Sequence, residues 1–94
     1  MNMQQKTKIA VVILNWNGSE MLRTFLPSVL QYSQTEGVEV VVADNASTDN
    51  SLTILAENFP TVRVIKLTEN HGFADGYNFA LKQVEAEYYV LLNS

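Results

Sequence analysis

Short apolar runs rich in Val and Ile recur along the chain at 9–14, 38–43, 62–67 and 88–92. Runs of about six residues with β-branched side chains predict strands, and continuous apolar runs are typical of strands buried on both faces of a sheet. Each run stops at Asn, Asp, Thr or Glu residues, most of which favour turns. The pattern therefore predicts strands over these ranges, with the one at 62–67 nearer a sheet edge because Arg63 and Lys66 interrupt it.

The segment after the first strand has the spacing of an amphipathic helix. Ser19 can cap this helix, and apolar residues then recur every three or four positions to about Gln34. Pro27 lies inside the pattern, where it removes a backbone hydrogen bond and crowds the preceding turn. We therefore expect a kink or a split near residues 25–26, leaving the helix in two pieces.

Two further helices are predicted by the same spacing. One runs from Asp49 or Asn50 to Asn58, and the other carries apolar positions from Phe73 to Val84. Strands joined by single helices imply a parallel sheet with right-handed crossovers. The fold class is therefore α/β, a Rossmann-like parallel sheet of order βαβαβαβ.

Composition and charge narrow the function classes. The chain is 47% hydrophobic and 17% charged, which fits a folded domain, and it has no cysteine for a disulfide or a thiolate metal site. A net charge of -4 opposes nucleic-acid binding, which needs clustered Lys and Arg. Residues 1–8 form a polar leader, expected to be flexible, with no signal-peptide core after it. A location in the cytoplasm, or at the cytoplasmic face of the membrane, is expected.

Polar side chains collect where the predicted strands end. The four ends carry Asn15-Trp16-Asn17, Asp44-Asn45, Thr68-Glu69-Asn70 and Asn93-Ser94. In an open parallel sheet, ligands bind at the carboxyl ends of the strands, at the point where the strand order reverses. These ends can converge on one crevice only if the fourth strand lies beside the first. We therefore predict the strand order 3-2-1-4, with the first two helices on one face and the third alone on the other.

No glycine-rich phosphate loop follows the first strand. This absence argues against both a nucleotide triphosphatase and a dinucleotide dehydrogenase. A nucleotide held without such a loop needs an aromatic face for the base, a carboxylate or amide for its edge, and a metal ion for the diphosphate. Trp16 and Asp44 can supply the first two of these.

Four stretches, in the same order, resemble successive motifs of the family 2 glycosyltransferases. They are residues 11–18 (VVILNWNG), 42–51 (VADNASTDNS), 70–78 (NHGFADGYN) and 89–94 (YVLLNS). The resemblance covers nearly the whole chain from Ile9 and is closest to the branch that includes rhamnosyltransferase-like enzymes. It implies that residues 9–94 are the nucleotide-sugar-binding half of a GT-A fold, with a UDP- or dTDP-sugar donor and inversion at the anomeric carbon. A glycan or lipid-linked molecule would be the acceptor.

The resemblance also implies roles for individual residues. Asp44 matches an aspartate that accepts a hydrogen bond from the pyrimidine N3, and Trp16 matches an aromatic residue next to the base. The donor-binding positions that follow from the strand ends and from the resemblance are Asn15, Trp16, Asn17, Asp44, Asn45, Asn70, Gly72, Asn78, Asn93 and Ser94.

The acidic motif that holds Mg²⁺ or Mn²⁺ in the family begins directly after a pair like Asn93-Ser94. The resemblance therefore implies no metal ligand and no catalytic base within these residues. We expect the chain by itself to be inactive, and to self-associate through the fourth strand or the face covered by one helix. An alternative is a non-catalytic α/β nucleotide-binding or regulatory module, although Asn15-Trp16-Asn17 lacks the carboxylates of a receiver-like domain. A further alternative is that the chain folds but binds no ligand tightly.

The positions of several polar residues can be explained by structural roles that need no ligand. Asn45 can organise a turn, and Ser47 and Asp49 can cap the second helix through its free backbone amides. Gly72 and Gly76 suggest close backbone approach around the start of the third helix.

Overall fold

The computed structural model describes residues 7–94 as one parallel sheet with helices on both faces. The strands are β1 (Ile9–Asn15), β2 (Val38–Asp44), β3 (Arg63–Lys66) and β4 (Tyr88–Asn93). The helices are α1 (Ser19–Tyr32), α2 (Ser51–Asn58) and α3 (Gly72–Leu81). The sheet order is β3-β2-β1-β4, and every neighbouring pair is parallel. The predicted α/β class and strand order 3-2-1-4 are confirmed.

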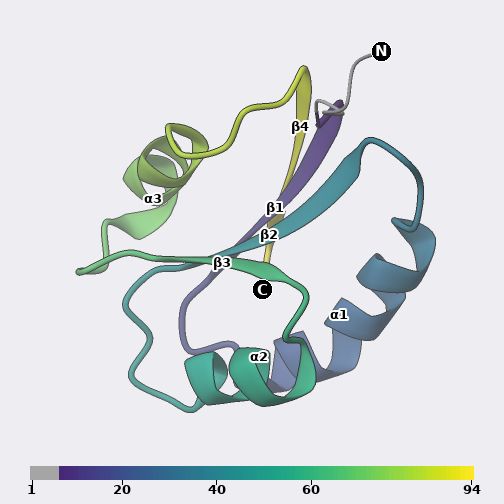
Figure 1. Cartoon of the computed structure of the whole chain (residues 1–94). Coiled ribbons are helices and arrows are strands. Elements are labelled where there is room, and N and C mark those ends of the chain that lie inside the picture. The colour runs from purple at the N-terminus through teal and green to yellow at the C-terminus, as the bar shows by residue number, and fades with distance from the viewer. Residues whose placement is uncertain (1–6) are drawn as a thin grey trace.

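Figure 1 shows α1 and α2 together on one face of the sheet and α3 alone on the other, as predicted. The α1 and α2 face is closed by a cluster around Leu22, Leu26 and Leu55, which pack on Ile13 and Val42. Alternate strand residues point to the other face and form a second cluster with α3 and the turn that follows it. Burial on both faces explains why the strands are continuous apolar runs.

The first helix is one continuous element, so the predicted split near residues 25–26 is wrong. Pro27 has no N–H to donate to the carbonyl of Arg23, one turn earlier in α1. Both residues lie on the exposed side of the helix. Water can hydrate that carbonyl, while Leu22 and Leu26 hold the opposite side of the helix in the core. Tertiary packing therefore outweighs the local cost of the proline.

The amino end of the sheet includes Lys8, whose N–H donates to the Gly37 carbonyl at 2.8 Å and whose carbonyl accepts from Tyr88 at 2.9 Å. Most of the leader predicted over residues 1–8 lies outside the described residues. Within residues 7–94, no helix has the length and apolar character needed to cross a membrane.

Candidate functional site

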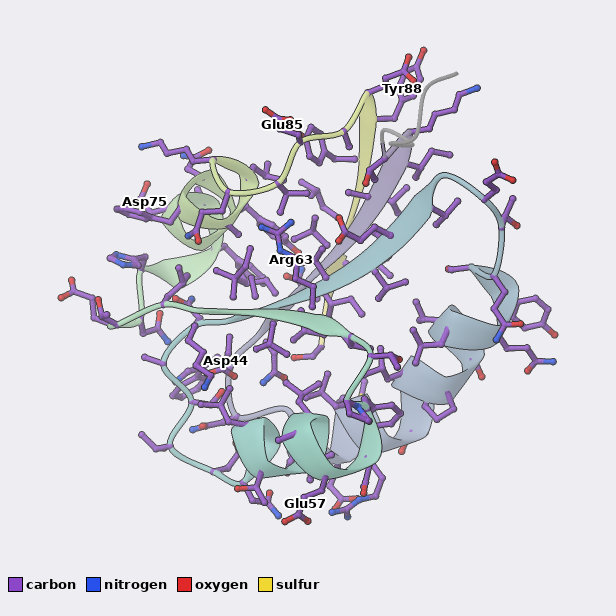
Figure 2. The ribbon with its side chains drawn as sticks, in the orientation of Figure 1. Asp44, Glu57, Arg63, Asp75, Glu85 and Tyr88 are labelled. Atoms are coloured by element: carbon purple, nitrogen blue, oxygen red, sulfur yellow. The ribbon has the colours of Figure 1, made fainter. Side chains whose placement is uncertain are left out.

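The carboxyl ends of β1 and β2 are joined by a buried pair of polar side chains. The strand register places Asn15 beside Asp44, and both are the last residues of their strands. The Asn15 amide donates to Asp44 Oδ1 at 3.0 Å and to Ser47 Oγ at 3.3 Å. Asn15 is 0% exposed and Asp44 is 1% exposed, so these bonds lie inside the protein. In Figure 2, Asp44 lies above α2 and far from Tyr88.

Asp44 also holds the loop that follows it. Its Oδ2 accepts from the Ser47 N–H at 2.9 Å, and its Oδ1 accepts from the Ser47 hydroxyl at 2.7 Å. Both carboxylate oxygens are therefore engaged by groups of the chain itself. In this conformation, direct contact between Asp44 and a nucleobase would require the loop after β2 to open.

The turn after β1 is fastened to the same loop. Asn17 Oδ1 accepts from the N–H groups of Thr48 and Asp49, at 2.7 and 3.1 Å, and the Asn17 N–H donates to Ser47 Oγ at 2.9 Å. Ser47 was expected to cap α2, and that expectation is wrong. Its hydroxyl instead links Asn15, Asn17 and Asp44.

Asp49 lies between the amino ends of two helices. Its Oδ1 accepts from the Ser51 N–H at 2.9 Å and its Oδ2 accepts from the Ser19 N–H at 3.2 Å. Partial burial opposes ionisation, but these hydrogen bonds outweigh it and hold the pKa of Asp49 below its ordinary value. The predicted cap of α2 by Asp49 is confirmed, whereas the cap of α1 by Ser19 is wrong, because Gly18 occupies that position without a side-chain bond.

The ends of β2 and β3 are joined through Asn45, which is 3% exposed. Its amide donates to Asn70 Oδ1 and to the Gly72 carbonyl, both at 3.2 Å, and its Oδ1 accepts from the His71 N–H at 3.0 Å. Gly72 has φ +73°, and a Cβ there would meet nothing, so backbone conformation explains this glycine better than close approach. At Gly76 close approach is confirmed, since a Cβ would lie 3.1 Å from Leu14 Cδ1.

The end of β4 is fixed to β1 and to α3. The Ser94 N–H donates to the Leu14 carbonyl at 3.1 Å, and the Ser94 hydroxyl donates to Asn15 Oδ1 at 2.7 Å. Tyr77 on α3 contacts Asn93 Oδ1 at 2.8 Å through its hydroxyl. Burial raises the pKa of Tyr77 above its ordinary value.

All four strand ends thus belong to one hydrogen-bonded network at one edge of the sheet. The network brings together Asn15, Asn17, Asp44, Asn45, Asn70, Gly72 and Ser94, the Asn45 N–H donating to the Asn15 carbonyl at 2.7 Å, while Asn93 bonds to Tyr77 next to it. Trp16 lies outside it and is 54% exposed. Asn78 is exposed on α3 and forms no side-chain hydrogen bond with residues 7–94.

The loop after β2 contains a strained backbone position that the sequence pattern did not predict. Ala46 has φ 62°, a left-handed conformation that costs a residue with a Cβ about 1–2 kcal/mol. We expect Ala46→Gly to raise the free energy of unfolding by roughly 0.5–1 kcal/mol, part of the relief being offset by the entropy of the glycine chain. Urea unfolding measures the change. The exposed Ala74→Gly on α3 is the control, which should instead lose about 1 kcal/mol of stability. Equal losses in both variants would contradict strain at Ala46.

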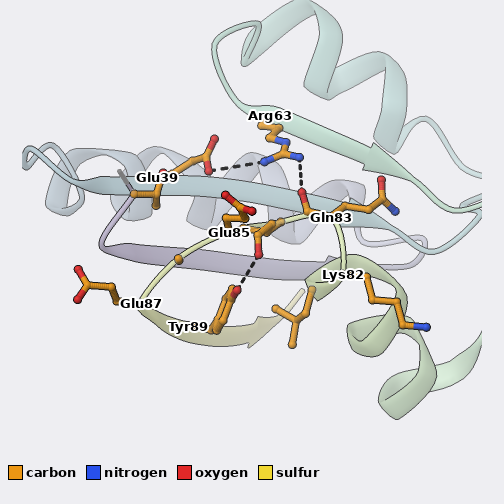
Figure 3. A pocket seen from close by; sticks show the side chains of 11 residues that line it. Glu39, Arg63, Lys82, Gln83, Glu85, Glu87 and Tyr89 are labelled. Carbon is orange, nitrogen blue, oxygen red and sulfur yellow. Dashed lines mark hydrogen bonds and ion pairs between the residues drawn. The ribbon is translucent and has the colours of Figure 1, made fainter. Parts of the chain in front are cut away.

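A hollow of about 1120 Å³ lies around the turn between α3 and β4, away from the carboxyl ends of the strands (Figure 3). One of its two cations, Arg63, already donates to the Gln83 carbonyl at 2.6 Å and lies 3.8 Å from Glu39. The hollow is open and far from the converging loops. It is therefore not the candidate ligand site.

Metal binding does not fit the described residues. Among residues 7–94 there is no group of three His, Cys, Asp or Glu side chains that could hold a metal ion. Asp44 is surrounded by neutral donors, and Asp49 holds two backbone N–H groups. These residues therefore offer no site at which a metal ion could take part in a reaction.

Two solved structures that are similar to this chain are complexes with nucleotides. A structure of S. aureus TarS residues 1–349 in complex with UDP matches 93% of this chain with a TM-score of 0.74 and 33% identity. A mannosyltransferase from Pyrobaculum calidifontis in complex with GDP-Man and Mn²⁺ matches 86% with a TM-score of 0.69 and 27% identity. The chain covers 27% and 25% of these structures, respectively.

A teichoic acid poly(glycerol phosphate) polymerase of Staphylococcus epidermidis is 29% identical over 91 residues, which is 93% of this chain and 12% of that protein. The chain thus spans a minor part of the relatives that it matches. The family model for glycosyl transferase family 2 matches residues 10–94, nearly everything from the start of β1. The chain belongs to glycosyl transferase family 2 and has its GT-A-like α/β fold.

Proposed function

We propose that this chain forms the donor-nucleotide side of an inverting glycosyltransferase of the rhamnosyltransferase-like branch. A UDP- or dTDP-sugar is the donor, and a glycan or lipid-linked molecule at the cytoplasmic face of the membrane is the acceptor. The observation that carries the proposal is the convergence of all four strand ends in one network beside exposed Trp16. The similar proteins in complex with UDP and GDP-Man support a nucleotide-linked sugar as the donor.

Within this proposal, buried and exposed residues act differently. Asn15, Asp44 and Asn45 hold the loops in place, and the exposed Trp16 offers its ring to the base. The backbone around Ala46 and Thr48 lies in the same loops, and the Thr48 N–H is held by Asn17 Oδ1 at 2.7 Å, so this loop shapes the surface beside Trp16. Asp44 then affects nucleotide affinity by keeping this surface in shape.

The diphosphate of a donor is negatively charged, and the net charge of this chain does not balance it. The net charge of the chain is -4, and no metal cluster exists among these residues, so the field of the chain opposes a nucleotide diphosphate. Mn²⁺ accompanies GDP-Man in the similar mannosyltransferase. We propose that in the whole protein a Mg²⁺ or Mn²⁺ site and the catalytic base lie outside this chain, which transfers no sugar alone.

The test is a titration of the ¹⁵N-labelled chain with UDP, dTDP and GDP, followed by NMR with and without Mg²⁺. We expect weak binding that shifts the Trp16 indole N–H and the backbone signals of residues 46–48. Stacking of a base on an aromatic ring contributes about 1–3 kcal/mol, so Trp16→Ala should weaken binding roughly tenfold or more. Tyr32→Ala removes another exposed aromatic at the end of α1 and should leave binding unchanged.

Shifts confined to the hollow near Arg63, or equal affinity for wild-type and Trp16→Ala proteins, would contradict the proposed site. No shift with any of the nucleotides at millimolar concentration would contradict nucleotide binding by this chain.

A further inference from the structure

The orientation of Trp16 depends on the short turn that carries it. Trp16 is 54% exposed, and its side chain forms no hydrogen bond or ring contact with residues 7–94. We call residues 16–18, which join β1 to α1, the Trp16 turn. Because the indole has no side-chain partner, the groups that fix the backbone of this turn also fix the direction of the ring.

One side of the Trp16 turn is fixed by Asn17. This residue has φ 52°, a left-handed conformation that Asn adopts more readily than most residues with a Cβ. Its Oδ1 accepts from the N–H groups of Thr48 and Asp49 at 2.7 and 3.1 Å, and its own N–H donates to Ser47 Oγ at 2.9 Å. The turn is therefore tied to the loop after β2 directly beside the indole.

The other side of the turn is fixed by the side chain of Asp49. Its Oδ2 accepts from the N–H of Ser19, the first residue of α1, at 3.2 Å. Its Oδ1 accepts from the N–H of Ser51, the first residue of α2, at 2.9 Å. The first N–H groups of a helix have no partner inside the helix, and Gly18 has no side chain that could supply one to α1. Asp49 thus gives α1 an acceptor that its own preceding residue lacks.

We propose that Asp49 is a positioning residue for Trp16. Its carboxylate bridges the starts of α1 and α2 and so holds the Trp16 turn, and with it the ring that is offered to a base. This inference rests on the proposed function, in which Trp16 stacks on the donor nucleotide. Asp49 acts through the turn and does not touch the nucleotide. Without the bridge, the turn is held only on the Asn17 side, and the indole leaves the orientation that suits a base.

The bridge differs from an ordinary helix cap in the reach that it needs. The bond to Ser51 spans two residues, and a serine at position 49 makes the same local bond, although more weakly. The bond to Ser19 joins residues that are 30 apart in the sequence. A serine hydroxyl lies closer to the backbone than a carboxylate oxygen does. Asp49→Ser is therefore expected to keep the bond to α2 and to lose the bond to α1.

The mobility of the turn in the nucleotide-free chain tests the bridge. Trp16 is the only tryptophan, so the ¹⁵N relaxation of its indole N–H and its fluorescence anisotropy report on this turn alone. In Asp49→Ser, the order parameters of the Trp16 N–H groups should fall towards the range of flexible segments, below about 0.6. Asp49→Asn keeps the shape of the side chain but offers one acceptor oxygen to two N–H groups, so an intermediate value is expected.

Asp75→Ser is the matched control. It removes the same charge from an exposed residue of α3 whose side chain forms no hydrogen bond with residues 7–94. The order parameters of Trp16 in this variant should equal those of the wild type.

A titration with UDP measures the consequence for binding. A site that adopts its binding conformation for only part of the time loses affinity by that fraction, so Asp49→Ser should weaken UDP binding about threefold to tenfold. Loss of a negative charge by itself favours an anionic ligand. Weaker binding by Asp49→Ser, together with unchanged or slightly stronger binding by Asp75→Ser, is therefore not an effect of charge.

Three results would count against these conclusions in different ways. Equal order parameters of Trp16 in the wild type and in both Asp49 variants would overturn the bridge. A mobile indole with unchanged UDP affinity would overturn the positioning role. A wild-type chain that binds no nucleotide would contradict the proposed function, whereas the order parameters, which are measured without ligand, show independently whether Asp49 holds the turn.

Discussion

Asp44→Ala is expected to lower the free energy of unfolding by about 3 kcal/mol, since each buried polar group left without a partner costs about 1–3 kcal/mol. The substitution removes the acceptor for the Asn15 amide, the Ser47 N–H and the Ser47 hydroxyl. Asn15 is fully buried, so water cannot replace that partner. Ser47 is only partly buried, and water can offset part of its loss. A domain of this size has about 5–15 kcal/mol of stability, so the loss is large.

Urea unfolding followed by circular dichroism measures the effect. Glu57→Ala is the matched control, because Glu57 is an exposed carboxylate on α2, and surface substitutions of this kind change stability by about 0.5 kcal/mol or less. Asp44→Asn keeps one acceptor oxygen but turns an amide N–H towards a donor, so an intermediate loss is expected. Equal unfolding midpoints for Asp44→Ala and Glu57→Ala would show that the buried network contributes nothing.

Asp44→Ala also distinguishes two roles of Asp44, holding the loop after β2 and accepting a hydrogen bond from a bound base. If Asp44 shapes the loop after β2, Asp44→Ala should disturb the NMR signals of residues 15–17 and 47–49 in the absence of nucleotide. An acceptor that acts only on a bound base would leave these signals in place and alter only the nucleotide titration. The free protein therefore distinguishes the roles before any ligand is added.

The strand order could be predicted because it follows from a constraint visible in the sequence. Each apolar run ends in polar residues, and only the order 3-2-1-4 brings those ends together at one crevice. The assignment of helices to faces then follows from right-handed crossovers. These conclusions depend on the periodicity of many residues, so a local exception such as Pro27 does not disturb them.

The partners of individual polar side chains could not be predicted in the same way. Ser47 precedes a helix and is suited to cap it, but the turn with Ala46 at positive φ directs its hydroxyl towards Asn15 and Asp44. The spacing of residues in the sequence does not show that the backbone turns at Ala46 and directs the Ser47 side chain away from the helix. The spacing of Asp44 and Ser47 does fit a local side-chain to backbone bond, the one signal that could have identified this contact.

Gly18→Ala is expected to destabilise the fold by about 2 kcal/mol, a cost typical of overpacking a well-packed site. A Cβ at position 18 would lie 2.5 Å from Asn15 Oδ1 and 2.5 Å from Ser94 Oγ. The Ser94 hydroxyl can rotate away, but it then loses its bond to Asn15. Asn15 cannot move without disturbing its bond to Asp44. The alanine therefore strains the network at the point where β1, β2 and β4 meet.

A double-mutant cycle identifies this cause. Ser94→Gly removes one of the two close contacts, so in that background Gly18→Ala should cost about half as much, and the two changes should not be additive. Thr24→Ala, an exposed substitution in α1, controls for the effect of alanine on the helix and should change stability by about 0.5 kcal/mol or less. If Gly18→Ala costs the same with and without the Ser94 side chain, the strain lies against Asn15 alone, and Ser94 is not held over the β1 turn as the structure indicates.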